Sequence, residues 1–129
     1  MKHTLLLILT FCTLNCFAQA KKMLYITTFT ANGIEEKDIK KQTSTASMAR
    51  IDLKLTLMGG GNYTAGKVLI QSRTGEKYKQ VSIMVTDDSK IPIYFKNPAE
   101  FVSYMAERGY EVTKKTLNKS GGDYTFKKK

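Results

Sequence analysis

The chain has 129 residues, with 21 Lys and Arg against 11 Asp and Glu, two cysteines, one histidine and no tryptophan. His3, Cys12 and Cys16 all fall within the first twenty positions. Without that segment the chain has no Cys, His or Trp, which excludes a thiol nucleophile, a Ser-His-Asp relay, a Cys/His zinc site and a disulfide framework.

The first twenty residues have the three parts of a secretory signal peptide. Lys2 precedes an apolar stretch over residues 5–17, and residues 18–20, Ala-Gln-Ala, give the small-x-small pattern that a signal peptidase accepts. The apolar stretch is shorter than the roughly 20 residues that a membrane-spanning helix needs. We therefore expect cleavage after Ala20, a single mature domain over residues 21–129 without a transmembrane helix, and export to the periplasm or the extracellular space.

A lipoprotein is the alternative that this segment leaves open. Cys12 and Cys16 both lie in it, but Phe11 and Asn15 precede them, where a lipobox has a small residue. Cleavage after Ala20 therefore remains the preferred expectation.

The expected mature chain is basic along its whole length. It holds 20 basic and 11 acidic residues, a net charge of about +9, and its lysine pairs and runs are spread from residues 21–22 to residues 127–129. A solvated surface accounts for such a distribution. Attraction to an anionic partner is the functional alternative.

The N-terminal half predicts two strands separated by a polar segment. Residues 23–30 are apolar, aromatic or β-branched and are followed by the turn signal Asn-Gly, so they predict a first strand. Residues 34–42 are charged and residues 43–47 are small and polar, which indicates a loop or a short surface helix. Residues 49–58 alternate apolar and polar side chains and give the clearest strand.

Shorter strands are predicted after the break at residues 59–62, Gly-Gly-Gly-Asn. They cover residues 67–72, residues 78–86 and residues 91–95. Thr-Gly and Asp-Asp-Ser sequences supply the turns between them.

Residues 98–108 predict the one α-helix, because several local signals agree there. Asn97 is an N-cap residue and Pro98 suits the first helical position. Gly109 stands where a left-handed C-terminal cap is needed. We assign these three residues structural roles.

The C-terminal residues predict a hairpin, with strands at residues 110–117 and 123–127 around the turn at residues 118–122. Its expected core face carries Tyr110, Val112, Tyr124 and Phe126. Taken together, the elements predict an α+β fold in which a small, mainly antiparallel sheet carries one packed helix.

Residues 91–111 resemble the C-terminal part of small uncharacterised exported proteins of Bacteroides-type bacteria. In that group a Phe-Lys lead-in meets a short helix ending in Tyr-Met, then Gly-Trp-Glu and a final hairpin rich in aromatics and lysine. Here the corresponding residues are Phe95-Lys96, Tyr104-Met105 and Gly109-Tyr110-Glu111, with Tyr in place of Trp. The resemblance implies an exported setting and a fold element, and it carries no activity.

Two features suggest an active site but have simpler explanations. Residues 61–67 satisfy G-x-x-x-x-G-K, but Val68 stands where a P-loop has Ser or Thr, and a strand is predicted where a P-loop has a helix. The adjacent acids at residues 35–36 and 87–88 would point to opposite sides of an extended chain, so neither pair forms facing carboxylates. We interpret them as a helix start and a turn, and assign no catalytic residue, metal ligand or cofactor.

The preferred hypothesis is a non-enzymatic binding module that meets an anionic envelope or extracellular partner through a basic surface or an exposed sheet edge. The binding candidates are Tyr63, in the glycine-rich connection, and the lysines Lys67, Lys114, Lys115 and Lys127. The alternative is a small glycan- or peptide-modifying enzyme that uses carboxylates. Nucleic-acid binding is disfavoured by the expected export, and the oligomeric state is left open.

We predict that the mature protein from its native host begins at Lys21, because Ala18 and Ala20 fit the peptidase subsites. Intact mass spectrometry measures this directly. A retained N-terminus or a lipidated Cys16 would overturn both the expected localisation and the exclusion of cysteine chemistry.

Overall fold

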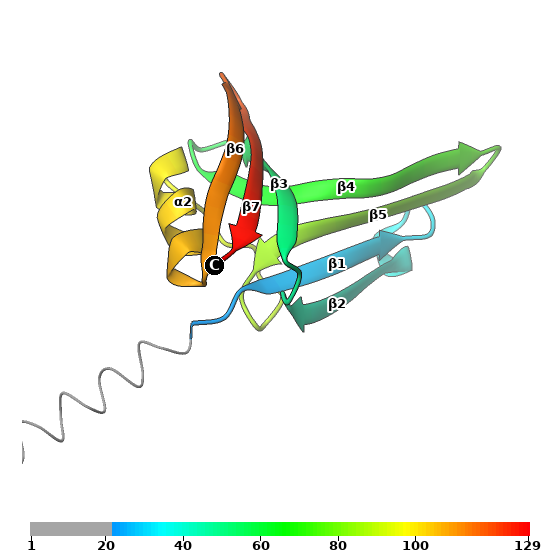
Figure 1. Cartoon of the computed structure of the whole chain (residues 1–129). Helices are drawn as coiled ribbons and strands as arrows, with labels where there is room; N and C mark the ends of the chain where they lie inside the picture. Colours follow the sequence, from blue (N-terminus) through cyan, green and yellow to red (C-terminus); the bar gives the residue numbers. More distant parts are fainter. Residues whose placement is uncertain (1–21) are drawn as a thin grey trace, which may run out of the picture.

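The computed structural model describes residues 22–129, so the predicted signal peptide lies outside the described residues. These residues form one seven-stranded antiparallel sheet, in the order β2-β1-β5-β4-β3-β7-β6, and one α-helix (Figure 1). The elements are β1 (Tyr25–Ala31), the short 3₁₀ helix η1 (Glu36–Asp38), β2 (Ile39–Thr45), β3 (Arg50–Leu57), β4 (Tyr63–Thr74), β5 (Lys77–Thr86), α2 (Pro98–Glu107), β6 (Tyr110–Asn118) and β7 (Gly121–Lys128).

The sheet changes direction at β3. This strand pairs with β4 only from Lys54 to Leu57, whereas it pairs with β7 from Arg50 to Thr56. Figure 1 shows β3, β6 and β7 running steeply across the direction of β1, β2, β4 and β5. The N-terminal half of β3 therefore leaves β4, and the sheet divides into two groups of strands.

Glycines lie in both strands that flank β3, and each permits a close backbone approach there. Gly66 of β4 pairs with Lys54, and Gly121 of β7 pairs with Thr56. A Cβ atom at Gly66 would overlap the carbonyl oxygen of Ile83, and one at Gly121 would overlap that of Leu55. Gly121 also has a φ of 136°, a backbone conformation that would be strained for any residue with a side chain.

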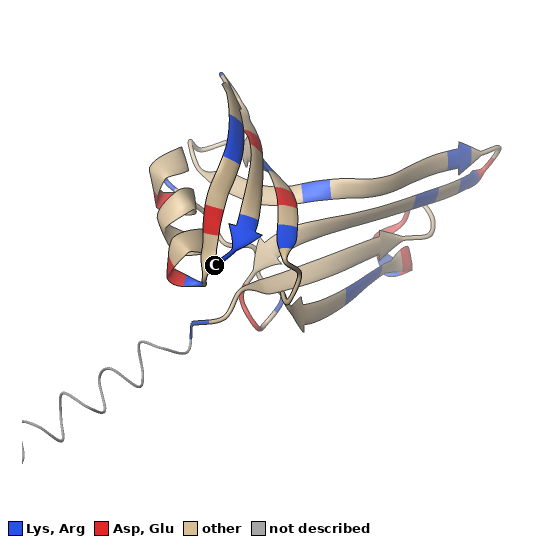
Figure 2. Ribbon diagram, in the orientation of Figure 1, with Lys and Arg blue, Asp and Glu red and all other residues tan. Residues whose placement is uncertain are grey.

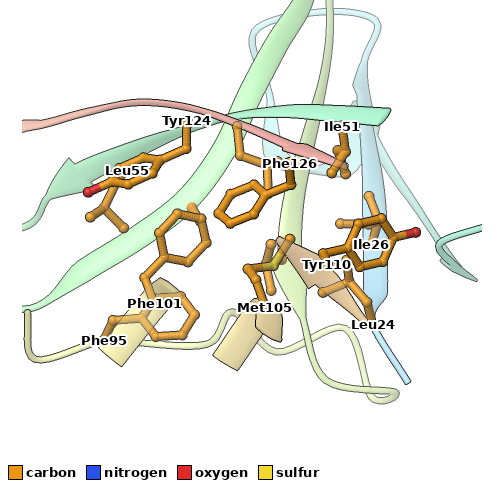
Figure 3. Close-up of a cluster of buried hydrophobic side chains, with 13 residues drawn as sticks. Leu24, Ile26, Ile51, Leu55, Phe95, Phe101, Met105, Tyr110, Tyr124 and Phe126 are labelled. Atoms are coloured by element: carbon orange, nitrogen blue, oxygen red, sulfur yellow. The ribbon is translucent and has the colours of Figure 1, made fainter. Parts of the chain in front are cut away.

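The hydrophobic core fills the angle between the two groups of strands and is closed by α2 (Figure 3). Phe101 and Met105 of the helix are fully buried. The ring of Phe101 lies 5.2 Å from that of Tyr124 and 5.3 Å from that of Phe126, both edge-to-face. Each such pair contributes about 0.5–1.5 kcal/mol beyond the burial of its area.

The C-terminal end of α2 contacts the first described residues of the chain. The guanidinium group of Arg108 stacks 3.4 Å from the centre of the Tyr104 ring. The same group donates hydrogen bonds to the carbonyl oxygens of Tyr104 and Met23, each at 3.1 Å. Lys22 forms an ion pair of 2.9 Å with Glu107. These contacts fix the entry into β1 beside the helix.

The local signals that predicted the helix are confirmed. The side chain of Asn97 accepts a hydrogen bond of 2.8 Å from the backbone nitrogen of Glu100, and Pro98 begins the helix. The helix ends at Glu107, one residue earlier than predicted, and Arg108 is its C-cap. Gly109 has the expected left-handed conformation, with a φ of 87°. The predicted hairpin, with Tyr110, Tyr124 and Phe126 in the core, is also confirmed.

The predicted α+β class is wrong, because the protein is mainly β. Strands account for 58% of the structure and helices for 12%. The missed strand is β2, whose side chains are nearly all exposed, so it lacks the alternation that marks a half-buried strand. The strand predicted at residues 91–95 is also wrong, since only Pro92 and Phe95 form isolated bridges there. Within residues 22–129, no helix has the length and apolar character needed to cross a membrane.

We predict unequal costs for alanine at two glycines with positive φ. Gly109→Ala should destabilise by about 1 kcal/mol, because the left-handed backbone is strained but no atom lies within 4 Å of the added Cβ. Gly121→Ala should cost at least about 2 kcal/mol more, because the Cβ meets the Leu55 carbonyl. Chemical denaturation measures both. Equal midpoints for the two variants would contradict the close approach of β7 to β3.

Candidate anion-binding site

Charged residues of both signs lie along β3, β6 and β7 (Figure 2). Ile51, Leu53 and Leu55 of β3 point into the core, so the residues between them point outward. Strand register places the outward residues side by side. They are Arg50, Asp52 and Lys54 of β3, Lys127, Thr125 and Asp123 of β7, and Glu111, Lys114 and Thr116 of β6.

A β-bulge in β6 decides which lysine belongs to this face. Val112 pairs with Phe126, but the next paired residue is Lys114, opposite Thr125, so Thr113 is the extra residue. The hydroxyl of Thr113 donates a hydrogen bond of 3.2 Å to the carbonyl oxygen of Thr125. Without the bulge, Lys114 would share the face of Val112. With it, Lys114 joins Thr125 on the outer face and Lys115 lies on the opposite one.

Three basic side chains surround a surface cavity of about 470 Å³ on this face. Arg50 of β3, Lys114 of β6 and Lys127 of β7 line it together with Ala49, Thr113 and Thr125. No acidic residue lines it. We call the three cations and their cavity the cationic pocket. Arg50 and Lys127 are direct cross-strand partners, and like charges in such positions destabilise a sheet. An anion in the pocket would offset that repulsion.

Asp52 stands beside the cationic pocket and is held in its charged form. The hydroxyl of Thr125 donates a hydrogen bond of 2.7 Å to Asp52 Oδ1. Arg50 Nη2 lies 3.7 Å from the same oxygen, and Lys67 Nζ lies 4.0 Å from Oδ2. The Thr125 hydrogen bond, followed by the charges of Arg50 and Lys67, lowers the pKa of Asp52. This carboxylate therefore accepts a hydrogen bond from Thr125 and forms exposed ion pairs with two cations.

The structure brings together only some of the residues predicted to bind. Lys114 and Lys127 line the cationic pocket, and Lys67 reaches the adjoining carboxylate of Asp52. Lys115 pairs with Tyr124 and takes the other face of the hairpin. Tyr63 is not at a loop tip, because its backbone is paired with that of Phe95 and its side chain packs against the core.

Arg50 is the residue of the pocket that sequence analysis missed. In the sequence it is one polar position of an alternating strand, which is typical of a solvated face. Only the register of β3 against β7 shows that it lies directly opposite Lys127. No local pattern carries that information, because the two residues are far apart along the chain.

The acidic pairs considered as catalytic candidates have local roles or lie in solvent. Asp87 Oδ1 accepts hydrogen bonds from the backbone nitrogens of Ser89, at 2.8 Å, and Ile91, at 3.0 Å, as a turn residue does. Glu35 forms an exposed ion pair of 2.9 Å with Lys37. No group of three or more potential metal ligands occurs among residues 22–129.

Comparison of the chain with family models, curated proteins and solved structures gives no significant match. The resemblance of residues 91–111 to exported Bacteroides-type proteins therefore stays a prediction.

We predict that Thr125→Val raises the pKa of Asp52 toward its ordinary value, since the largest cause of the shift is the Thr125 hydrogen bond. A pH titration of the Asp52 carboxyl carbon by NMR measures this. The folded-state pKa is depressed, so the network stabilises the protein above the unfolded pKa of about 3.9 and loses its effect as pH falls through the folded value. The variant should thus be less stable than wild type at neutral pH and approach it in acid.

Thr116→Val is the matched control, because Thr116 lies on the same outer face opposite Asp123. It should leave the titration of Asp52 unchanged. An equal rise in both variants would show that the shift does not depend on the Thr125 hydroxyl.

Proposed function

We propose that the domain is an exported, non-enzymatic module that binds an anionic partner through the cationic pocket. The observation that carries the proposal is the convergence of Arg50, Lys114 and Lys127, from three different strands, around one concavity without an acid. Arg50 and Lys127 are direct cross-strand partners, an arrangement that destabilises a sheet. Asp52, beside Arg50, and Glu111, opposite Lys127, offset part of this repulsion. An anion bound in the pocket would relieve the rest.

The support of the pocket favours recognition by a preformed site. All three cations stand on paired strands, and Arg50 is further oriented by Asp52. A cation held on a rigid framework loses less conformational entropy on binding than one on a loop. Arginine adds a planar guanidinium that can hold a carboxylate, sulfate or phosphate with two hydrogen bonds. The shared ligand chemistry is an oxyanion on an envelope or extracellular molecule.

The alternative, a carboxylate-dependent enzyme, finds less support in the geometry. A general acid needs a raised pKa, whereas the pKa of Asp52 is lowered by its partners. Asp87 already accepts two backbone hydrogen bonds in its turn. Reproducible turnover of a glycan or peptide that is lost on replacing Asp87 or Glu36 would favour the enzyme instead.

We predict salt-dependent, pH-independent binding of anionic probes. Heparin, polyglutamate and phosphatidylglycerol vesicles should bind at low ionic strength, and the affinity should fall at least about tenfold between about 0.05 M and 0.5 M salt. Residues 22–129 contain no histidine, so affinity should change little between about pH 6 and pH 8. Binding of all three probes that persists at high salt would contradict an electrostatic site.

We further predict that two adjacent lysines contribute unequally. Lys114→Gln should weaken binding by about five- to tenfold, because it removes one cation of the pocket. Lys115→Gln makes the same charge change on the opposite face of the hairpin and should have little effect. Equal losses would show that net charge, and not the pocket, attracts the probe.

A further inference from the structure

The C-terminal part of β4 has a strand partner on one side only. Pairing between β3 and β4 ends at Lys54 and Gly66, while β4 continues with β5 as far as Thr74. Among residues 22–129, the backbone bonds that β4 makes outside its strand ladders are those between Tyr63 and Phe95. Residues 67–74 therefore present a free edge, interrupted by a β-bulge in which Leu69 is the extra residue between Val68 and Ile70.

The free edge of β4 is apolar where other edges of the sheet are polar. Val68, Leu69 and Ile70 are each 52% exposed. The two outermost strands, β2 and β6, instead carry adjacent lysines, Lys40–Lys41 near the start of β2 and Lys114–Lys115 near the centre of β6. Lysines protect an edge from pairing with another chain. A run of three exposed aliphatic residues has the opposite effect.

A cavity of about 580 Å³ opens beside this edge, in the space where β3 leaves β4. Its apolar wall includes Ile26, Ile51, Leu69 and Ile83, and the segment from Ser44 to Met48 closes one side. A side chain from an added strand would enter this cavity next to Leu69. The free edge thus has both main-chain pairing groups and a pocket for a side chain, the two parts of recognition by strand addition.

The charges around the edge indicate the composition of the occupant. Lys67 and Arg73 lie at the two ends of the apolar run, and Arg50 lies on the rim of the cavity. The acid on this rim, Asp52, already holds Thr125, Arg50 and Lys67. In a second copy, antiparallel pairing centred on Ile70 would set Lys67 against Arg73, which carry like charges. An acidic segment instead brings carboxylates to both ends, and it gains most at Arg73, because Lys67 already lies 4.0 Å from Asp52.

We propose that residues 67–74 of β4 bind an extended acidic polypeptide segment of another protein, which adds to the sheet as a strand. It pairs with the main chain of β4 on both sides of the bulge at Leu69, and an apolar side chain enters the cavity beside Leu69. Its flanking carboxylates meet Lys67 and Arg73. The proposal takes the anionic character of the partner from the proposed function and identifies the partner as polypeptide.

The test uses the capped peptide Glu-Val-Thr-Val-Thr-Val-Glu, which spans the edge from residue 67 to residue 73. Fluorescence anisotropy gives its affinity for the protein, and hydrogen–deuterium exchange locates it. We expect protection of residues 67–74. The same peptide N-methylated at its five central amides keeps its charge but cannot pair through them, so it should bind at least about tenfold more weakly.

Two substitutions form a matched pair. Ile70→Asp and Leu117→Asp each replace an exposed aliphatic residue on a strand with a free edge, and each adds one negative charge. Ile70→Asp should weaken peptide binding about tenfold, because it places a charge in the apolar run and repels the acidic peptide. Leu117→Asp should have little effect. Circular dichroism and thermal denaturation check that both variants fold.

The proposal is overturned if the peptide does not bind at a concentration of about 1 mM. Equal affinity of the N-methylated peptide, or protection at β2 or β6 instead of β4, also overturns it. These results do not depend on how the variants fold. Failure of the cationic pocket is recognised separately, because Lys114→Gln would then leave heparin binding unchanged whatever the peptide does.

Discussion

The fold depends on close backbone approaches among the strands around the C-terminal half of β3. A Cβ atom at Gly121 of β7 would overlap the carbonyl oxygen of Leu55 in β3. One at Gly66 of β4 would overlap that of Ile83 in β5, and one at Gly122 of β7 would overlap that of Thr116 in β6. These approaches lie where β3 pairs with both β4 and β7, from Lys54 to Thr56. Since a side chain at these positions would push the strands apart, this arrangement of the strands depends on glycine there.

This change of direction creates both the core and the free edge. If β3 followed β4 along its full length, its N-terminal half would no longer run with β7 over α2. Ile51 and Leu53 would then leave the cluster that contains Phe101 and Phe126. The core therefore forms in an arrangement in which β3 and β4 do not pair beyond Gly66. The unpaired edge and the cavity beside it are direct consequences of how the protein buries its aromatic residues.

Sequence analysis predicted the elements whose signals are local and missed those that depend on strand register. The helix was predictable because Asn97, Pro98 and Gly109 act on the backbone next to them. The exposed strand β2 was not, because it has no buried face to impose alternation. The same limit applies to the candidate site, since Lys114 and Lys127 were candidates as lysines but Arg50 was not. Their convergence depends on the register between β3, β6 and β7.

The bulge at Thr113 illustrates why net charge alone does not define a binding surface. Two identical lysines follow it in the sequence, yet one inserted residue directs Lys114 toward Arg50 and Lys127 and directs Lys115 away. Total charge is the same with or without the bulge, whereas the local field differs, because interactions between exposed charges are screened over about 8–10 Å. Arg50, which lies 3.7 Å from Asp52, adds a planar guanidinium donor that lysines lack. In the proposed function, selectivity for an anion would therefore arise from strand geometry, and the overall basic charge would contribute mainly to the rate of encounter.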